Sequence, residues 1–125
     1  MKMSDSEMKI MALIWENGGV VTTAWLTQRL GETGWKATTI LTFLARLEEK
    51  GFLTVRKNGR QNLYEAAISR EEYQREETQS FIRQIHGGSY KSLFAALCAP
   101  GQLTAGEVEE LRRWFEGEDG TKGGQ

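Results

Sequence analysis

The chain has 125 residues, of which 39% are hydrophobic and 26% charged, and its formal net charge is −1. These values are ordinary for a globular protein. The length fits one compact unit, with or without an appended arm. The start of the chain lacks a signal-peptide pattern, and no apolar run approaches the roughly 18 residues of a membrane span. Because Cys98 is the single cysteine, we expect no intrachain disulfide and no cluster of thiolate metal ligands. Together these features favour a cytoplasmic protein.

Two helices are predicted in the first 30 residues. The first begins with the capping-box spacing of Ser4 and Glu7, continues with apolar residues at helical spacing, and ends at Gly18. A short extended link follows. Thr22 or Thr23 can then cap a second helix that runs to about residue 30.

A third helix is predicted near residues 36–50, and Gly51 is the expected left-handed residue that closes it. One side of this helix carries an apolar stripe that includes Ile40 and Leu44. The opposite side and its borders carry small hydroxyl residues and an arginine: Thr38, Thr39, Thr42 and Arg46. A helix with these two sides can pack on a core and expose a polar reading face.

Two strands are predicted over residues 52–57 and 60–65, joined at Asn58-Gly59, which is a strong hairpin signal. The pattern leaves open whether the loop has two residues or a longer bulged form. A reading helix followed by a basic hairpin is what a winged helix needs to enter a DNA major groove and hold the flanking backbone. The sequence therefore favours a DNA-binding transcriptional regulator.

Three more helices are predicted after the hairpin. A long polar helix follows the capping-box spacing of Ser69 and Glu72 and runs to about His86, where two glycines break it. A fifth helix stops at Pro100, and a sixth starts at Thr104 with a further capping box.

The predicted fold is mainly α with a small β-wing, an N-terminal winged helix-turn-helix followed by a C-terminal helical dimerisation arm. Its domains are the DNA-binding domain (residues 1–68), the dimerisation domain (69–116) and a disordered tail (117–125). The apolar residues of the arm need burial, and a symmetric partner chain would provide it. The expected dimer interface consists of Phe81, Ile82, Ile85, Leu93, Phe94, Leu97, Leu111, Trp114 and Phe115.

The distribution of charge supports this reading better than the sum does. Residues 36–64 carry six Lys/Arg against two Asp/Glu, a net charge of +4. Residues 1–35 have a net charge of −1 and residues 65–125 a net charge of −4. The basic charge is therefore concentrated where the reading helix and the hairpin are predicted.

Four segments resemble the penicillinase-repressor family of winged-helix regulators (the BlaI/MecI/CopY group): residues 4–15, 35–47, 50–53 and 81–93. The resemblance implies a homodimeric, DNA-binding transcriptional repressor. It also implies, for some members, release by a membrane sensor protease that cleaves the dimer arm, here within residues 93–97. Leu41 departs from the family pattern, because many members have a basic or polar residue there. The copper-sensing branch has a C-terminal cysteine cluster that this chain lacks.

The candidate DNA contacts fall into two sets. Threonine offers a hydroxyl and a methyl to a base edge, and arginine can reach guanine or a phosphate. The base and groove set is Thr38, Thr39, Thr42 and Arg46, and the backbone set is Thr22, Thr23, Lys36, Arg56, Lys57, Asn58 and Arg60. Lys50 is a weaker backbone candidate. In isolation, the base and groove set is better explained as the solvated face of a helix. The hairpin residues could be charged for solubility, and Thr22 and Thr23 could simply cap a helix.

Other readings remain open. The chain could be a ligand-sensing winged-helix regulator of another family, or an interaction adaptor that uses the winged helix without DNA. Trp15, Trp25 and Trp35 are at helical spacing and are expected in the core, with Trp25 partly exposed. His86 is expected to be structural and Cys98 to be buried. No motif in the sequence supports an enzyme, a cofactor or a metal site.

Overall fold

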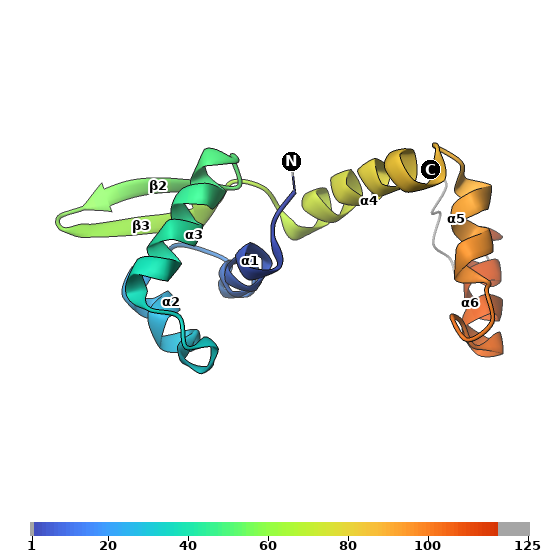
Figure 1. Cartoon of the computed structure of the whole chain (residues 1–125), viewed down its shortest axis with the longest axis horizontal. Helices are drawn as coiled ribbons and strands as arrows, with labels where there is room; N and C mark the ends of the chain where they lie inside the picture. The colour runs from blue at the N-terminus through green and yellow to red at the C-terminus, as the bar shows by residue number, and fades with distance from the viewer. Residues whose placement is uncertain (1, 118–125) are drawn as a thin grey trace. The chain divides into compact units, whose positions relative to one another are not determined.

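The computed structural model describes residues 2–117, and contacts divide the chain into two compact units, Met1–Glu77 and Thr78–Gln125. The expected tail lies outside the described residues, apart from Gly117. The elements follow the order α1 (Asp5–Asn17), β1 (Val21–Thr22), α2 (Thr23–Arg29), the 3₁₀ turn η1 (Gly31–Thr33), α3 (Ala37–Glu49), β2 (Leu53–Asn58), β3 (Gln61–Ala66), α4 (Arg70–His86), α5 (Tyr90–Leu97) and α6 (Ala105–Phe115) (Figure 1).

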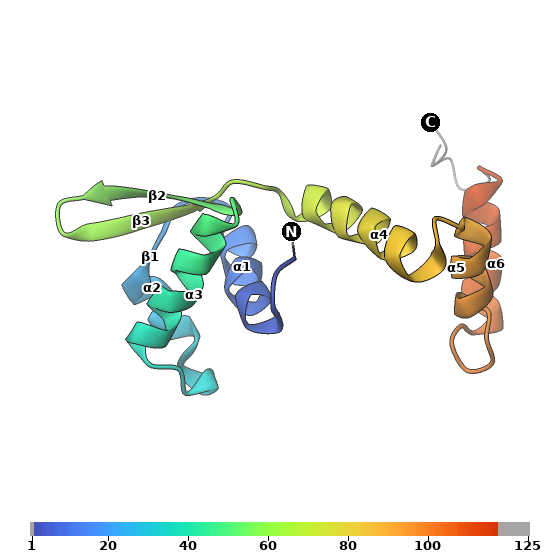
Figure 2. The ribbon, with the colours of Figure 1, turned by 45° about the horizontal axis from the view of Figure 1, so that its top comes forward.

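In the first unit, a small antiparallel sheet accompanies three helices. Its strand order is β1-β3-β2, and Val21 of β1 pairs with Tyr64 of β3. The sequence predicted the β2–β3 hairpin, but β1 was expected only as an extended link. The two-residue strand is too short to show an alternating pattern, so its pairing was not predictable. The helices α1, α2 and α3 lie beside the root of the hairpin, whose tip projects away from them (Figures 1 and 2).

The core of this unit is built from the apolar faces of its helices and from the first residues of the hairpin. Its fully buried side chains are Ile10, Met11, Ile14, Leu26, Ile40, Leu44, Leu47 and Glu7. Trp15, Trp25 and Trp35 are partly buried and pack against this core, as the sequence predicted. A carboxylate among these fully buried side chains requires partners, because an isolated buried charge is costly.

The hairpin turn differs by one residue from the prediction. Asn58 pairs with Gln61, so the two loop residues are Gly59 and Arg60 and not Asn58 and Gly59. Gly59 has φ +68°, whereas Arg60 has a negative φ. A two-residue hairpin with a positive φ at its first central position is typical of a type II′ turn, which favours glycine there. This register leaves Arg60 exposed at the tip.

The start of α4 belongs to the first unit through Tyr73, which is buried. Its hydroxyl oxygen accepts a hydrogen bond of 2.9 Å from the backbone N–H of Met3. The indole Nε1 of Trp15 donates to the carbonyl oxygen of Ile68 at 2.9 Å. The segment that leads into α4 is therefore attached to α1 and to the N-terminal residues.

The second unit contains the end of α4 together with α5 and α6. Phe94 and Phe115 pack edge to face with ring centroids 5.2 Å apart, which brings α5 and α6 together. Nδ1 of His86 and the hydroxyl of Ser92 are 2.8 Å apart, which links α4 to the start of α5. None of the helices described for residues 2–117 combines the length and apolar character that a bilayer crossing needs.

Candidate nucleic-acid interface

The orientation of α3 is set by its apolar stripe. Ile40, Leu44 and Leu47 are buried against α1 and α2, so the opposite side of α3 faces outward. Thr38, Thr42 and Arg46 are exposed on it, and Thr39 is half-buried at its border, as the sequence predicted. The hydroxyl of Thr42 donates to the carbonyl oxygen of Thr38 at 3.0 Å. Its proton is therefore used within the helix, and its methyl group is left for contact.

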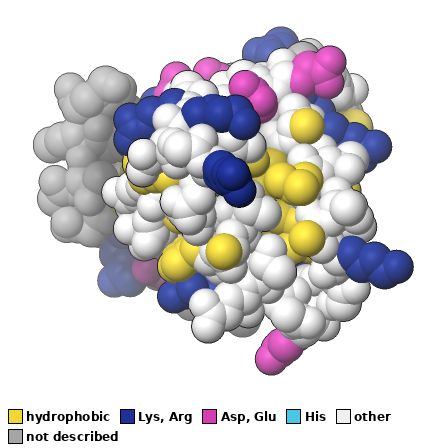
Figure 3. Space-filling model, turned by 90° about the vertical axis from the view of Figure 1, so that its left-hand side faces the viewer, with side chains coloured by type: hydrophobic (Ala, Val, Ile, Leu, Met, Phe, Trp, Pro, Cys, Tyr) yellow, Lys and Arg dark blue, Asp and Glu magenta, His cyan; other side chains and the backbone are white. Residues whose placement is uncertain are grey.

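The hairpin supplies the predicted cations. Strand alternation turns Leu53 and Val55 toward the core and leaves Thr54 and Arg56 exposed. The hairpin residues of the predicted backbone set, Arg56, Lys57, Asn58 and Arg60, are all exposed. Figure 3, which views the side from which the hairpin projects, shows apolar side chains with Lys and Arg around them and several Asp and Glu at the top and bottom. The exposed cations of the hairpin can attract a polyanion.

The start of α2 carries the other two threonines of the predicted backbone set, Thr22 and Thr23. The hydroxyl oxygen of Thr22 accepts from the backbone N–H of Trp25 at 3.1 Å, so Thr22 is the N-cap residue of α2. The guanidinium of Arg29 lies 4.0 Å from the ring centroid of Trp25. Thr23 is half-buried in the first turn, and its carbonyl oxygen accepts from the hydroxyl of Thr27. Thr22 therefore caps the helix, and capping is sufficient to explain a threonine at this position without a DNA contact.

Lys36 and Lys50 flank α3 but are in different environments. Lys36 is exposed at the N-cap position, where it is available to an anion. Lys50, by contrast, donates through Nζ to Oε1 of Glu7 at 2.7 Å and to the carbonyl oxygen of Lys2 at 3.0 Å. The prediction of Lys50 as a weak DNA-backbone contact therefore does not fit the structure, because its charge is matched by a buried carboxylate.

Glu7 is 1% exposed. Burial alone would raise the pKa of its carboxyl group. The hydrogen bonds from Lys50 and from the backbone N–H of Ser4 outweigh burial, so the pKa of Glu7 lies below its ordinary value. The sequence identified Glu7 only as part of a capping box, and the box is present in the structure. No sequence pattern identified Lys50 as the partner of Glu7, because the two residues are 43 positions apart.

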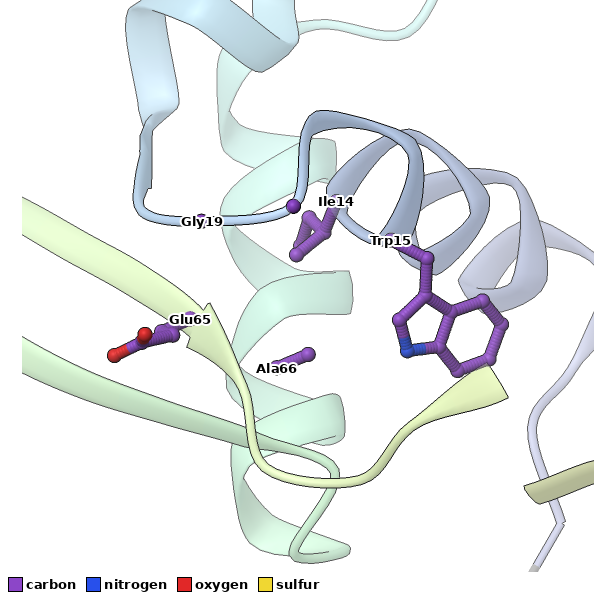
Figure 4. Close-up of a pocket in the computed structure, with 6 residues that line it drawn as sticks. Ile14, Trp15, Gly19, Glu65 and Ala66 are labelled. Carbon is purple, nitrogen blue, oxygen red and sulfur yellow. The ribbon is translucent and has the colours of Figure 1, made fainter. Parts of the chain in front are cut away.

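A small pocket lies between the end of α1 and β3 (Figure 4). Its volume is about 170 Å³, and its lining residues are Ile14, Trp15, Gly18, Gly19, Glu65 and Ala66. Ligand pockets usually hold roughly 300–1,000 Å³. Glu65 is the one charged lining residue, and its carboxylate points away from the Trp15 ring. This pocket is too small for an ordinary effector and has the wrong charge for an anion.

The side chains predicted for a dimer interface differ in exposure. Ile85 is 65% exposed and Phe115 60%, whereas Ile82 is 3% exposed and is therefore already covered within one chain. Phe81, Leu97 and Leu111 are exposed, and Leu93, Phe94 and Trp114 are half-buried. The second unit thus leaves much apolar surface in contact with water. The prediction that Cys98 is buried is wrong, because Cys98 is exposed after the end of α5.

Comparison with known proteins agrees with this geometry. A family model described as "Penicillinase repressor" matches residues 3–117. Over 115 residues the chain is 29% identical to the penicillinase repressor of Bacillus licheniformis, covering 92% of this chain and 90% of that protein.

Two solved structures are similar to the first unit. The solution structure of the DNA binding domain of the repressor BlaI has a TM-score of 0.52 and 34% identity, covering 58% of this chain and 88% of that one. The solution structure of the Bacillus licheniformis BlaI monomeric form in complex with the blaP half-operator has a TM-score of 0.50 and 34% identity, covering 58% and 89%. These likenesses confirm the predicted winged-helix fold and the family resemblance.

Proposed function

Since the chain belongs to the penicillinase repressor family, we propose that it is a sequence-specific DNA-binding repressor that acts as a homodimer on a pseudo-palindromic operator. The observation that carries the proposal is the outward side of α3, where Thr38, Thr42 and Arg46 are exposed beside a basic hairpin. In this proposal α3 enters the major groove, and Arg56 and Arg60 bind the flanking phosphates. The matched relative is a repressor, which is consistent with a non-enzymatic role.

We also propose that residues 69–116 form the dimer arm. Two recognition helices held by a two-fold dimer read two half-sites about one helical turn of DNA apart. The exposed apolar side chains of the second unit, including Ile85 and Phe115, support this assignment. Their burial between two chains would remove apolar surface from water.

Release of the repressor by cleavage within residues 93–97 is the finer part of the proposal. These residues form the C-terminal part of α5, an eight-residue helix. A protease binds an extended backbone, so cleavage would require local unfolding of this helix, and helices this short are marginal without packing. Cleavage would then separate α6 from the rest of the arm and weaken the dimer.

Fluorescence anisotropy on the promoter duplex of the chain's own operon tests the proposal. Thr42→Ala is expected to relax sequence preference by about 0.8 kcal/mol, because it removes the methyl group that Thr42 leaves for contact with a base edge. Arg60→Ala is expected to weaken binding to all sequences alike and to reduce the salt dependence, because it removes a phosphate contact. If both variants bind like the wild type, the site assignment is wrong. If the wild type shows no salt-sensitive duplex binding at low salt, the interaction-adaptor alternative is favoured instead.

A further inference from the structure

Leu41 is the apolar residue that stands out on the reading side of α3. It is 42% exposed. Helical spacing places it on one face with Thr38, Thr42 and Ala45, and all four residues are exposed. A single exposed leucine needs no special explanation. This one, however, lies at the border of the side that the proposed function turns toward a base-pair edge, one helical turn from Ala45.

The groups that this face offers are mainly methyl groups. The hydroxyl proton of Thr42 is used in the hydrogen bond to the Thr38 carbonyl oxygen at 3.0 Å. Leu41 and Ala45 have no polar side-chain atoms. This face therefore presents the methyl groups of Leu41, Thr42 and Ala45, with Arg46 at its border and Glu49 at its C-terminal end.

Charge complementarity favours DNA as the occupant of this apolar face. The same helix and the hairpin carry exposed cations, among them Lys36, Arg46 and Arg60, whereas Glu48 and Glu49 are exposed at the C-terminal end of α3. An apolar protein surface is a poor partner for these cations, whereas a DNA duplex carries dense negative charge on both sides of each groove. In the major groove, thymine is the standard base that presents a methyl group, and apolar side chains contact it there.

We propose that Leu41, assisted by the Thr42 and Ala45 methyl groups, reads the 5-methyl group of thymine. The operator half-site then contains an A·T pair beneath the middle of α3, and Leu41 is a specificity-determining residue. The proposal rests on the proposed function, because α3 must lie in the major groove for Leu41 to meet a base.

The test uses the full-length chain and duplexes that the wild-type protein selects from a random library. Each thymine of a selected half-site is replaced in turn by deoxyuridine, which lacks only the 5-methyl group, and affinity is measured by anisotropy. At one or two positions we expect deoxyuridine to weaken binding about fourfold, the ratio that corresponds to burial of one methyl group. Leu41→Ala is expected to remove most of this difference at the same position. Because Leu41 is exposed, this variant should keep its fold.

Two matched variants serve as controls. Leu41→Met keeps an apolar side chain of similar reach and should retain most of the deoxyuridine penalty. Arg60→Ala should weaken both duplexes equally and leave their ratio unchanged. The thymine proposal is overturned if Leu41→Ala retains the full penalty at every position, or if no wild-type position shows one, while selective DNA binding still stands. Failure of the wild type to select any duplex overturns the proposed function as well.

Discussion

Replacement of Lys50 by methionine tests how α3 is attached to the rest of the first unit. The variant keeps an unbranched apolar side chain and removes the ammonium group that donates to Oε1 of Glu7 at 2.7 Å. Glu7 is then left buried with the backbone N–H of Ser4 as its remaining described donor. The link between the end of α3, the start of α1 and the carbonyl oxygen of Lys2 is lost.

The magnitude follows from the exposure of the two partners. Removal of one partner of a fully buried ion pair costs roughly 3–5 kcal/mol, whereas an exposed pair contributes less than about 1 kcal/mol. The Glu7 side chain is 2% exposed and the Lys50 side chain 26%, so water reaches one end of the pair. We expect Lys50→Met to lower the free energy of unfolding by about 2 kcal/mol at neutral pH. The double variant Lys50→Met, Glu7→Gln should recover part of this loss, because it leaves no unpaired charge buried.

Urea unfolding followed by tryptophan fluorescence measures the loss. A Trp114→Phe background confines the signal to the Met1–Glu77 unit, to which the other tryptophans belong. Lys57→Met is the matched control, since Lys57 is exposed on the hairpin and its replacement should change stability by less than about 0.5 kcal/mol. A loss for Lys50→Met no larger than that of the control would refute the reasoning.

The effect has a predicted pH dependence. The pKa of Glu7 is lowered in the folded chain, so the wild type has this stabilisation above the ordinary glutamate pKa and loses it as pH falls toward the lowered value. The Lys50→Met variant lacks the stabilising partner and has less to lose on acidification. The difference between the two proteins should therefore shrink as pH falls through the ordinary glutamate range. A difference that stays constant would mean that the carboxylate is not its source.

Two further predictions concern other parts of the chain. Thr22→Ala should destabilise the first unit by about 1 kcal/mol, because it removes the oxygen that accepts from the Trp25 N–H. Thr22→Ser should keep the cap, and urea unfolding of both variants distinguishes a cap from a packing effect. In the proposed dimer, Ile85→Asp should lower the apparent mass in sedimentation, because it places a charge on an apolar contact; an unchanged mass would exclude Ile85 from the interface.

Local signals made much of the first unit predictable. The capping box of Ser4 and Glu7, the apolar stripe of α3 and the Asn-Gly dipeptide of the hairpin each act within a few residues, so the sequence displays them directly. The same locality explains the error at the turn. Asn58-Gly59 is the preferred pair of a type I′ turn, but the register makes Gly59 the first loop residue and gives a two-residue loop one position later.

Contacts between residues far apart in the sequence were not predictable, because no local signal records them. The hydrogen bond of Met3 to Tyr73 joins residues 70 positions apart, and no periodicity records such a contact. Lys50 looked like a free cation at the end of a DNA-reading helix. Its role became clear only when folding placed it beside Glu7. The sequence therefore predicted which side of α3 faces outward, but not which of the neighbouring cations are available to DNA.

The engagement of Lys50 changes the electrostatic argument for DNA binding. Of the six basic residues between positions 36 and 64, Lys50 is paired, and the exposed ones are Lys36, Arg46, Arg56, Lys57 and Arg60. Each phosphate contact contributes about −0.9 to the slope of log affinity against log salt concentration, so this segment of one copy can supply a slope of at most about −4.5. Because two copies double that limit, a steeper slope on an operator duplex requires either a second copy or cations outside this segment. Residues 1–35 and 65–125 together have a net charge of −5, which works against non-specific binding by the rest of the chain. Strong binding would therefore depend on both recognition units acting together.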